Sequence, residues 1–508
     1  MTFKRHRIPL TLCVVLLGGC ISPPPKPNVD SLVPTTWRAM TASNPAEAGD
    51  ARCGTQAAGS SACSDSASAS TSASAPASTS IVSDTISAEW WRGFGSDELD
   101  TVVQRAVDGS NDISAAIARV QQAAAQARIA GAALWPGIDA NVTAQRQIGG
   151  AGDITVQNGN SFAASLTASY ELDFWGKNRA LRRSALSELD ASVFDRDTVR
   201  LTTVSTAASL WLQIVALRER AAIASRNVEL ARRTLALTES RTRAGAASPL
   251  DVAQQRGLVA SQERNAAALR QAANDDEATL AVLLGEPVER VAVKTDSLAQ
   301  VNVNAIDAGV PSALLVRRPD IARAEARLSA ADANIVAARA AMLPSVTLNP
   351  SVGFASNTVH TLFDTPLYTL AGGLVAPIFE GGRLSGQRDL AIAQREELLA
   401  NYRASIVNAF GEVDKALNAI GGVDAQLRAQ DEALAQAQRA ETLSMARYRA
   451  GAETMLTVLS TQQTLFDAQD LYVQLKQARL QADLSLYQAL GGGWATPRDT
   501  ASGLDGAS

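Results

Sequence analysis

The sequence predicts an α+β membrane protein built from two tandem repeats, each made of a helix, two strands and a long helical hairpin. Three observations predict this fold class: landmarks that recur at one offset, alternating segments of membrane-spanning length, and unusually long helices. The chain has 508 residues, few aromatic side chains (5%) and a net charge of −5. Long runs rich in Ala, Gln, Arg and Leu are typical of extended helices and coiled coils. The weak net charge does not indicate nucleic-acid binding.

Three pairs of landmarks recur at nearly one offset. The motif Arg243-Ala244-Gly245 returns 206 residues later as Arg449-Ala450-Gly451. The other two pairs lie 208 and 205 residues apart: Pro136 with Pro344, and Gly176 with Gly381. A constant offset is the signature of an internal repeat. The first repeat is therefore placed at 86–290, the second at 312–490, and a connector at 291–311.

Each repeat opens with a helix and continues with two strands. The helices are expected at 111–134 and 312–342, and the strand pairs at 137–175 and 345–380. Apolar residues alternate with polar ones in both strand regions, a period typical of strands with one apolar face. These runs approach the roughly 9–11 residues of a membrane-spanning strand. The alternating residues are Ile138, Ala140, Val142, Ala144, Phe162, Ala164, Leu166, Ala168, Tyr170 and Leu172, then Val346, Leu348, Val352 and Phe354.

Long helical hairpins follow the strands, at 177–285 and 383–490. No Pro interrupts 177–243 or 384–450, and such a helix would be on the order of 100 Å long. Each turns at Arg-Ala-Gly and returns through 250–284 or 456–490. Apolar residues at heptad spacing predict a seam that packs on neighbouring helices: Leu201, Val204, Ala208, Trp211 and Val215, then Ile406, Phe410, Val413, Leu417 and Ile420.

Four strands are too few to close a barrel, and open strand edges are not tolerated in hydrocarbon. Several chains must therefore pool their strands. Two copies would supply eight strands around an interior filled by side chains, and three copies would supply twelve strands around a lumen.

The N-terminus resembles a lipoprotein signal peptide over residues 1–19. A basic start precedes an apolar run too short to span a bilayer, which ends in Leu17-Gly18-Gly19-Cys20. This ending predicts N-acylation (palmitate) and S-diacylglycerol attachment at Cys20; the alternative is an ordinary secretory signal with an incidental cysteine. Ile21, rather than Asp, favours the outer membrane. Residues 20–85, rich in Ser and Ala, are expected to be a flexible tether.

Few residues are suited to chemistry. Beyond the signal, the chain has one histidine, His360, and, apart from Cys20, two cysteines, Cys53 and Cys63, whose disulfide pairing stays open. This content is too small for the usual zinc sites, and no phosphate-binding Gly-rich loop is present. We predict no catalytic residue, no metal site and no cofactor other than the lipid, so the chain is expected not to be an enzyme.

Five motifs resemble the outer membrane factor family (TolC-like channels), in its lipoprotein branch that serves resistance-nodulation-division pumps (NodT type). They are Trp90-Trp91-Arg92-Gly93-Phe94, Tyr170-Glu171-Leu172-Asp173-Phe174-Trp175-Gly176, Leu284-Gly285-Glu286-Pro287, Pro311-Ser312-Ala313-Leu314-Leu315 with Arg317-Arg318-Pro319-Asp320-Ile321, and Pro377-Ile378-Phe379-Glu380-Gly381-Gly382-Arg383. Their order and duplication, over about residues 90–490, make the resemblance specific.

The resemblance implies a homotrimer in the Gram-negative outer membrane, with a twelve-stranded β-barrel on a long α-helical barrel. Residues 286–311 and the flexible tail 491–508 would contribute an equatorial region. The chain would be the exit duct of a tripartite efflux system that carries toxic compounds or drugs, and so contributes to antibiotic resistance. A periplasmic adaptor would dock at the hairpin tips (Arg243, Ala244, Gly245, Arg449, Ala450, Gly451), and an inner-membrane pump would supply energy.

The same resemblance implies a periplasmic gate near the tips, with candidates Asp251, Arg449, Glu453 and Ser460. Relatives often carry Asp where this chain has Ser460, so the gate departs from the family pattern here. Alternatives remain: a channel for type I protein secretion or for metal ions, and a periplasmic coiled-coil lipoprotein without a pore. The sequence names neither the substrate nor the adaptor.

Overall fold

The computed structural model describes residues 29–34, 36–38, 87–148, 159–302 and 308–494. The chain divides into two compact units. The strand unit contains residues 115–196 and 320–405, and the hairpin unit contains 30–114, 197–319 and 406–494 of the described chain. Among the described helices, none combines the length and apolar character needed to cross a membrane.

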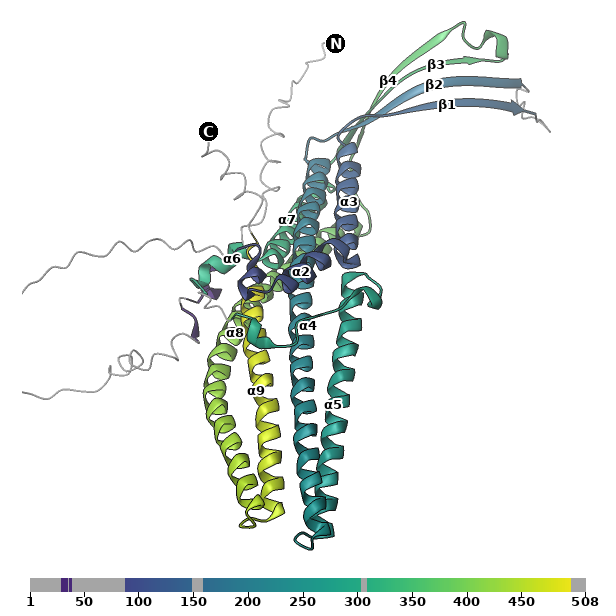
Figure 1. Cartoon of the computed structure of the whole chain (residues 1–508). Coiled ribbons are helices and arrows are strands. Elements are labelled where there is room, and N and C mark those ends of the chain that lie inside the picture. Colours follow the sequence, from purple (N-terminus) through teal and green to yellow (C-terminus); the bar gives the residue numbers. More distant parts are fainter. Residues whose placement is uncertain (1–28, 35, 39–86, 149–158, 303–307, 495–508) are drawn as a thin grey trace, which may run out of the picture. The chain divides into compact units, whose positions relative to one another are not determined.

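A four-stranded antiparallel sheet forms one end of the strand unit (Figure 1). Its strands run in sequence order: β1 (Gly137–Gln147), β2 (Gly159–Leu172), β3 (Ser345–Ser356) and β4 (Pro366–Val375). The pairing of β2 with β3 joins the two repeats in one sheet. The strands fall within the two regions that alternation of apolar and polar residues predicts.

Helices of both repeats pack together in the strand unit. They are α3 (Asn111–Ala132), α7 (Pro319–Ala340), and the first turns of α4 (Lys177–Arg243) and α8 (Arg383–Arg449). Ala180 of α4 is buried against Val336 and Ala337 of α7. Arg395 of α8 pairs with Asp332 of α7 at 2.8 Å. The small side chains of Ala180 and Ala337 let α4 and α7 approach closely. The ion pair between Arg395 and Asp332 joins α8 to α7.

The helix expected over 312–342 is not continuous. It is divided into the 3₁₀ turn η6 (Pro311–Ala313), the short α6 (Leu314–Arg317), and α7. The break falls at Arg318, whose backbone is extended. Pro319 follows directly, and a residue before proline is sterically disfavoured in the α region. The expectation of one unbroken helix was therefore wrong.

Two helical hairpins make up most of the hairpin unit (Figure 1). The longer helices α4 and α8 have 67 residues each and return through α5 (Pro249–Leu284) and α9 (Met455–Ala489). Arg220 of α4 forms two parallel hydrogen bonds to Asp470 of α9, at 2.7 and 2.9 Å. The hairpins end within one or two residues of the boundaries predicted from the Arg-Ala-Gly repeats.

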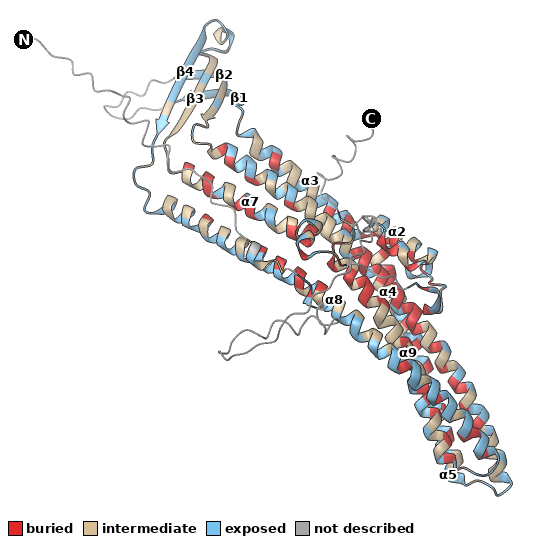
Figure 2. Cartoon of the chain, turned by 90° about the vertical axis from the view of Figure 1, so that its left-hand side faces the viewer, coloured by how far each residue is buried: buried red, intermediate tan, exposed pale blue. Residues whose placement is uncertain are grey.

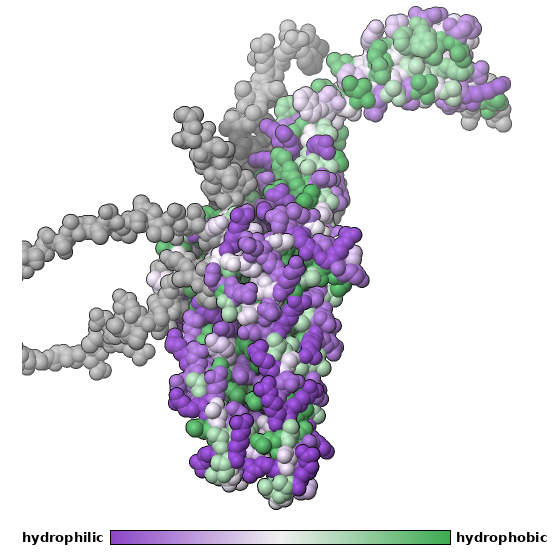
Figure 3. Space-filling model, in the orientation of Figure 1, coloured by the Kyte–Doolittle hydropathy of each residue, from purple (hydrophilic) through white to green (hydrophobic). Residues whose placement is uncertain are grey.

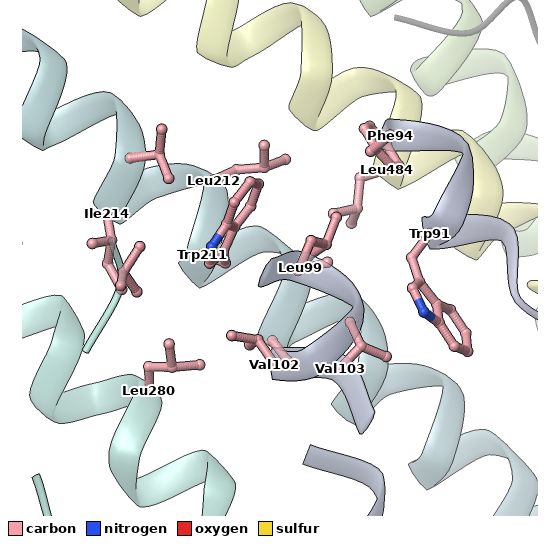
Figure 4. Packing of buried hydrophobic residues seen from close by; sticks show 14 of the residues in the cluster. Trp91, Phe94, Leu99, Val102, Val103, Trp211, Leu212, Ile214, Leu280 and Leu484 are labelled. Carbon is pink, nitrogen blue, oxygen red and sulfur yellow. The ribbon is translucent and has the colours of Figure 1, made fainter. Parts of the chain in front are cut away.

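The largest apolar core lies in the hairpin unit, around Trp211 and Leu280 (Figure 4). Most buried residues in this unit lie where several helices meet, as Figure 2 shows. Trp90 in η3 (Trp90–Phe94) stacks on Tyr487 at a ring-centroid distance of 4.9 Å. The helix α2 (Asp97–Gly109), which sequence patterning did not separate, packs onto this core, as do residues near η4 (Val288–Arg290) and η5 (Leu298–Gln300).

Two terminal segments also pack onto the hairpin unit. After the turn η1 (Asp30–Leu32), Trp37 is buried beside Phe410, and its Nε1–H donates to the carbonyl of Gly309 at 2.8 Å. Trp494 donates to Asp197 at 3.0 Å. A docked segment thus lies inside the expected tether, and the first four residues of the expected tail belong to the fold. The other tether and tail residues lie outside the described part.

Candidate channel wall and hairpin tips

The sheet has one apolar face and one polar face. Directly paired residues of antiparallel strands lie on the same face. One row across all four strands reads Ala140, Leu166, Val352 and Tyr368, and the adjacent row reads Asp139, Thr167, Ser351 and Thr369. Apolar residues gather over the strands in Figure 3. The sheet can therefore separate an apolar environment from water, without an apolar core between two layers.

The two outer strands of this sheet are open in the single chain. The order β1-β2-β3-β4 leaves one edge of β1 and one edge of β4 without a strand partner among the described residues. Every residue of β1 is exposed. Unpaired backbone groups are costly in hydrocarbon, since no water is present to bind them. Both edges therefore require partners from other chains if the sheet lies in a membrane.

A capped junction joins β2 to α4. The carboxylate of Asp173 accepts backbone hydrogen bonds from Asn178 (3.1 Å) and Arg179 (2.9 Å), which satisfies two free N–H groups of the helix start. Burial opposes ionisation of Asp173, but these bonds and the Arg179 guanidinium outweigh it and lower the pKa of the carboxyl group. Trp175 donates to the carbonyl of Pro344 at 2.7 Å, which ties the junction to the second repeat.

Both hairpin tips use the same helix ending. Gly245 and Gly451 have φ values of 73° and 75°, a left-handed conformation that glycine adopts without steric cost. Ala246 N–H donates to the carbonyl of Arg241, and Gly245 N–H to that of Thr242, at 2.8 and 3.0 Å. The second tip repeats both bonds 206 residues later. This is the Schellman motif, so the local backbone explains the recurring glycine without reference to a partner.

The helices that follow the tips are also capped. Ser248 accepts from the backbone N–H of Asp251, and Asp251 accepts from that of Ser248, at 3.2 and 2.9 Å. In the second tip, Thr454 is the N-cap, and Glu453 accepts from Thr454 N–H and the Thr457 hydroxyl. These two bonds, despite some desolvation, lower the pKa of Glu453, and nearby Arg447 adds to the effect.

The four gate candidates thus differ in their surroundings. Asp251 belongs to a capping box, and Glu453 combines its hydrogen bonds with an ion pair to Arg447 at 3.5 Å. Arg449 is exposed beside the turn, as are the docking candidates Arg243, Ala244 and Gly245 of the first tip and Ala450 and Gly451 of the second. Ser460 is exposed on α9. The structure brings Arg449 and Glu453 to one tip, whereas Asp251 lies at the other.

A contact that sequence reasoning missed joins the two tips. Arg241 of α4 lies over the ring of Tyr448 of α8, 4.5 Å from its centroid, and donates to the backbone carbonyl of Tyr448. Beside it, Tyr448, Met445, Met455 and Val458 form a buried cluster. The repeat offset relates Arg241 to Arg447 and gives no indication that Arg241 meets Tyr448.

Several predicted features lie outside the described residues. They include Cys20, the signal peptide, and the pair Cys53 and Cys63. Within the described chain, no group of three or more His, Cys, Asp or Glu side chains is placed to hold a metal ion. His360 lies in the exposed turn η7 (Val359–Thr361) between β3 and β4.

A family comparison identifies the two repeats. The model of the outer membrane efflux protein family matches residues 102–286 and 310–492. The chain belongs to the outer membrane efflux protein family. Members of the outer membrane efflux protein family are trimeric channels that work with efflux pumps in tripartite systems, and this chain is such an outer-membrane exit duct. The resemblance of the sequence motifs to the outer membrane factor family is confirmed.

Individual relatives within the outer membrane efflux protein family extend over most of the chain. It is 49% identical to the pyoverdine export outer membrane protein OpmQ of Pseudomonas aeruginosa, over 81% of this chain and 88% of OpmQ. The identity to the pyoverdine export outer membrane protein OpmQ of Pseudomonas putida is 43%, over 98% of this chain and 100% of that protein. The identity to the toluene efflux pump outer membrane protein TtgI of Pseudomonas putida is 33%, over 80% of this chain and 87% of TtgI. A solved structure of CusC superposes with a TM-score of 0.75 and 28% identity, covering 79% of this chain and 94% of CusC.

Proposed function

We propose that three copies of this chain close their sheets into one twelve-stranded barrel, with the polar face toward a water-filled lumen. The observation that carries this proposal is the two-faced sheet with open edges at β1 and β4. Three sheets joined edge to edge leave no backbone group unpaired in hydrocarbon. Asp139, Thr167, Ser351 and Thr369 would then face passing solute. Conduction needs no bond to be made or broken, so the duct would be passive and not an enzyme.

The hairpin tips would receive the periplasmic adaptor. Gly245 and the residues beside it are exposed, rigidly capped and free of side-chain crowding, since a Cβ added at Gly245 would have no neighbour within 4 Å. The inner-membrane pump would be of the resistance-nodulation-division class.

The duct would close at the end that carries the hairpin tips. Arg449, Glu453 and Ser460 would contribute to this closure, and Asp251 would act chiefly by ordering the first tip.

The lipid at Cys20 would hold the chain at the outer membrane. Two or more acyl chains give stable anchoring, at about 0.8 kcal/mol per buried methylene. Radiolabelled palmitate should be incorporated into the wild-type protein and not into Cys20→Ser. A cleaved protein that lies in the outer membrane but carries no label would show an ordinary secretory signal instead.

The cargo is proposed to be a small secreted molecule of the pyoverdine class, an iron chelator. The two relatives named for pyoverdine export are 49% and 43% identical, against 33% for the toluene relative. One of the former aligns over 98% of this chain. Drug efflux, predicted from the sequence motifs, is the second candidate, and the toluene relative supports it.

The test compares cells with and without the gene. We would measure secreted iron chelator under iron limitation, together with intracellular accumulation of amphiphilic dyes and divalent metals. Loss of chelator from the medium, with retention in the periplasm, supports the first cargo. Dye accumulation alone supports drug efflux. Unchanged export of all three classes, with the protein present in the outer membrane, would refute both.

A further inference from the structure

Cations gather in the strand unit where the helices meet the sheet, and they fall into two groups. Three are each paired with a nearby carboxylate: Lys177 with Glu171, Arg179 with Asp173, and Arg383 with Glu380. Three others, Arg128, Arg182 and Arg183, are exposed. These last three make no hydrogen bond or ion pair with any residue in the described part of the chain. Three arginines in this part of the strand unit are therefore not paired with a carboxylate.

A cavity between the end of α3 and the start of α4 includes two of these arginines. Arg128 and Arg182 line it together with small and apolar residues, namely Ala124, Ala127, Gly131, Ala132, Leu134, Trp135, Leu186 and Leu189. The guanidinium Nε of Arg182 lies 3.6 Å from where a Cβ on Gly131 would stand, so the Arg182 side chain lies close to α3 at Gly131. An adjoining cavity shares Arg182 and adds Arg183.

Exposed aromatic residues mark the level of these cavities. Trp135 lies shortly before β1, Phe174 shortly after β2 and Phe379 shortly after β4, with exposed fractions of 76%, 65% and 88%. Aromatic side chains at the ends of membrane strands lie at the level of lipid headgroups. If the strands span the membrane, as the proposed function requires, the arginine-lined cavities lie at the same level.

We propose that the cavity lined by Arg128 and Arg182 binds the headgroup of an anionic glycerophospholipid in the periplasm-facing leaflet. The guanidinium groups match phosphate oxygens in charge and in fork geometry, and basic pockets between membrane-protein helices bind such headgroups. Ala124, Leu134 and Leu186 supply apolar surface for the glycerol and the first methylenes of the acyl chains. A free phosphate ion would make no use of that surface, which favours a lipid.

The inference rests on the proposed function, because it needs the sheet to lie in the membrane. The test is native mass spectrometry of the purified trimer with phosphatidylglycerol or zwitterionic phosphatidylcholine added to the detergent. Wild type should retain phosphatidylglycerol in preference to phosphatidylcholine. Arg128→Gln/Arg182→Gln should lose most of that preference. The matched control, Arg232→Gln/Arg256→Gln in the hairpin unit, should retain it.

Three outcomes would overturn the inference while leaving the exit duct intact. One is equal phosphatidylglycerol retention by the variant and wild type. Another is equal retention of both lipids by wild type, and the third is full displacement by inorganic phosphate, which would indicate a plain anion site. Trimer mass and single-channel conductance are recorded on the same samples. A glutamine variant that neither trimerises nor conducts is misfolded and cannot be used. The variant Arg128→Lys/Arg182→Lys then takes its place. It keeps both positive charges and should therefore keep the preference for phosphatidylglycerol.

Discussion

Arg241 of the first repeat and Tyr448 of the second are in direct contact at the hairpin tips. The guanidinium carbon lies 4.5 Å from the ring centroid, and a guanidinium N–H binds the Tyr448 carbonyl. Tyr448 is buried and Arg241 is half-buried. A cation–π contact in such surroundings contributes about 0.5–2 kcal/mol. This pair therefore links the ends of two hairpins that are otherwise capped independently.

Replacing Arg241 with Ala should loosen the tips and increase leakage through the closed duct. We expect a several-fold higher open fraction of the purified trimer in planar bilayers without adaptor. Tyr448→Phe should behave like wild type, because it keeps the ring and removes only a buried hydroxyl that has no hydrogen-bond partner. Arg256→Ala, which breaks only the exposed pair with Glu239 (2.7 Å), is the control. Equal leakage in Arg241→Ala and this control would contradict the role assigned to the contact.

Two glycines isolate the effect of backbone strain, because an added Cβ would be uncrowded at both. Gly245→Ala should lower stability by about 1 kcal/mol, because an L-residue is strained at φ 73° although nothing lies within 4 Å of its Cβ. Gly257→Ala, in the interior of α5 and equally open, should raise stability by about 0.5–1 kcal/mol. Thermal unfolding of the trimer measures both. The glycine argument fails if both variants shift in the same direction.

The open strand edges predict where neighbouring chains touch. The test uses a variant in which Cys53 and Cys63 are replaced. Each double variant then carries one new cysteine in β1 and one in β4 of the same chain, and the assembled protein is oxidised. At least one pair, such as Asn141→Cys with Thr369→Cys or a shifted neighbour, should give covalent dimers and trimers. Thr167→Cys with Ser351→Cys should crosslink only within a chain, since these residues are directly paired. Intermolecular products from that central pair alone would exclude the proposed edge-to-edge closure.

Glu98 should make the hairpin unit sensitive to acid. Burial alone would raise the pKa of Glu98. Its carboxylate, however, accepts hydrogen bonds from the Thr295 hydroxyl, the backbone N–H groups of Lys294 and Thr295, and the Trp211 side chain. These bonds outweigh burial, so the pKa of Glu98 is lower than its ordinary value of 4.5. A lowered folded-state pKa contributes stability that is present above pH 4.5 and is lost as pH falls through the folded value.

Glu98→Gln should therefore flatten the fall in melting temperature below about pH 4.5. Asp97→Asn, at an exposed neighbouring residue, should keep the wild-type profile. Melting curves of the detergent-solubilised protein from neutral to acidic pH make the comparison. Parallel profiles for wild type and Glu98→Gln would show that other carboxylates dominate the acid response.

Trp37 should fasten the N-terminal segment to the hairpin unit. Trp37→Ala removes its packing on Phe410 and its bond to Gly309, a loss of about 3 kcal/mol for a fully buried aromatic residue. Trypsin should then cut after Arg38 much faster than in wild type. Trp37→Phe keeps most of the packing and should be intermediate. Equal cleavage in all three proteins would show that the docking is not stable in solution.

Much of the architecture was predictable because local signals repeat. The Arg-Ala-Gly turns located both hairpin tips, where Gly245 and Gly451 end their helices in identical Schellman motifs. Alternation of apolar and polar residues located the strands, since pleated strands expose opposite faces in turn. The unbroken 312–342 helix was wrong because the steric effect of Pro319 on Arg318 outweighed the surrounding helical pattern.

The sequence by itself determined the duplication, the element types and the family, because these depend on spacing along the chain. Only the tertiary structure decided which residues meet: Arg241 with Tyr448, Trp37 with Gly309, and Arg128 with Arg182 around one cavity. Trp37 and Gly309 are 272 residues apart. Periodicity reports only which face of an element is apolar. The pairing of faces depends on how helices from both repeats pack together, and no local pattern records that choice.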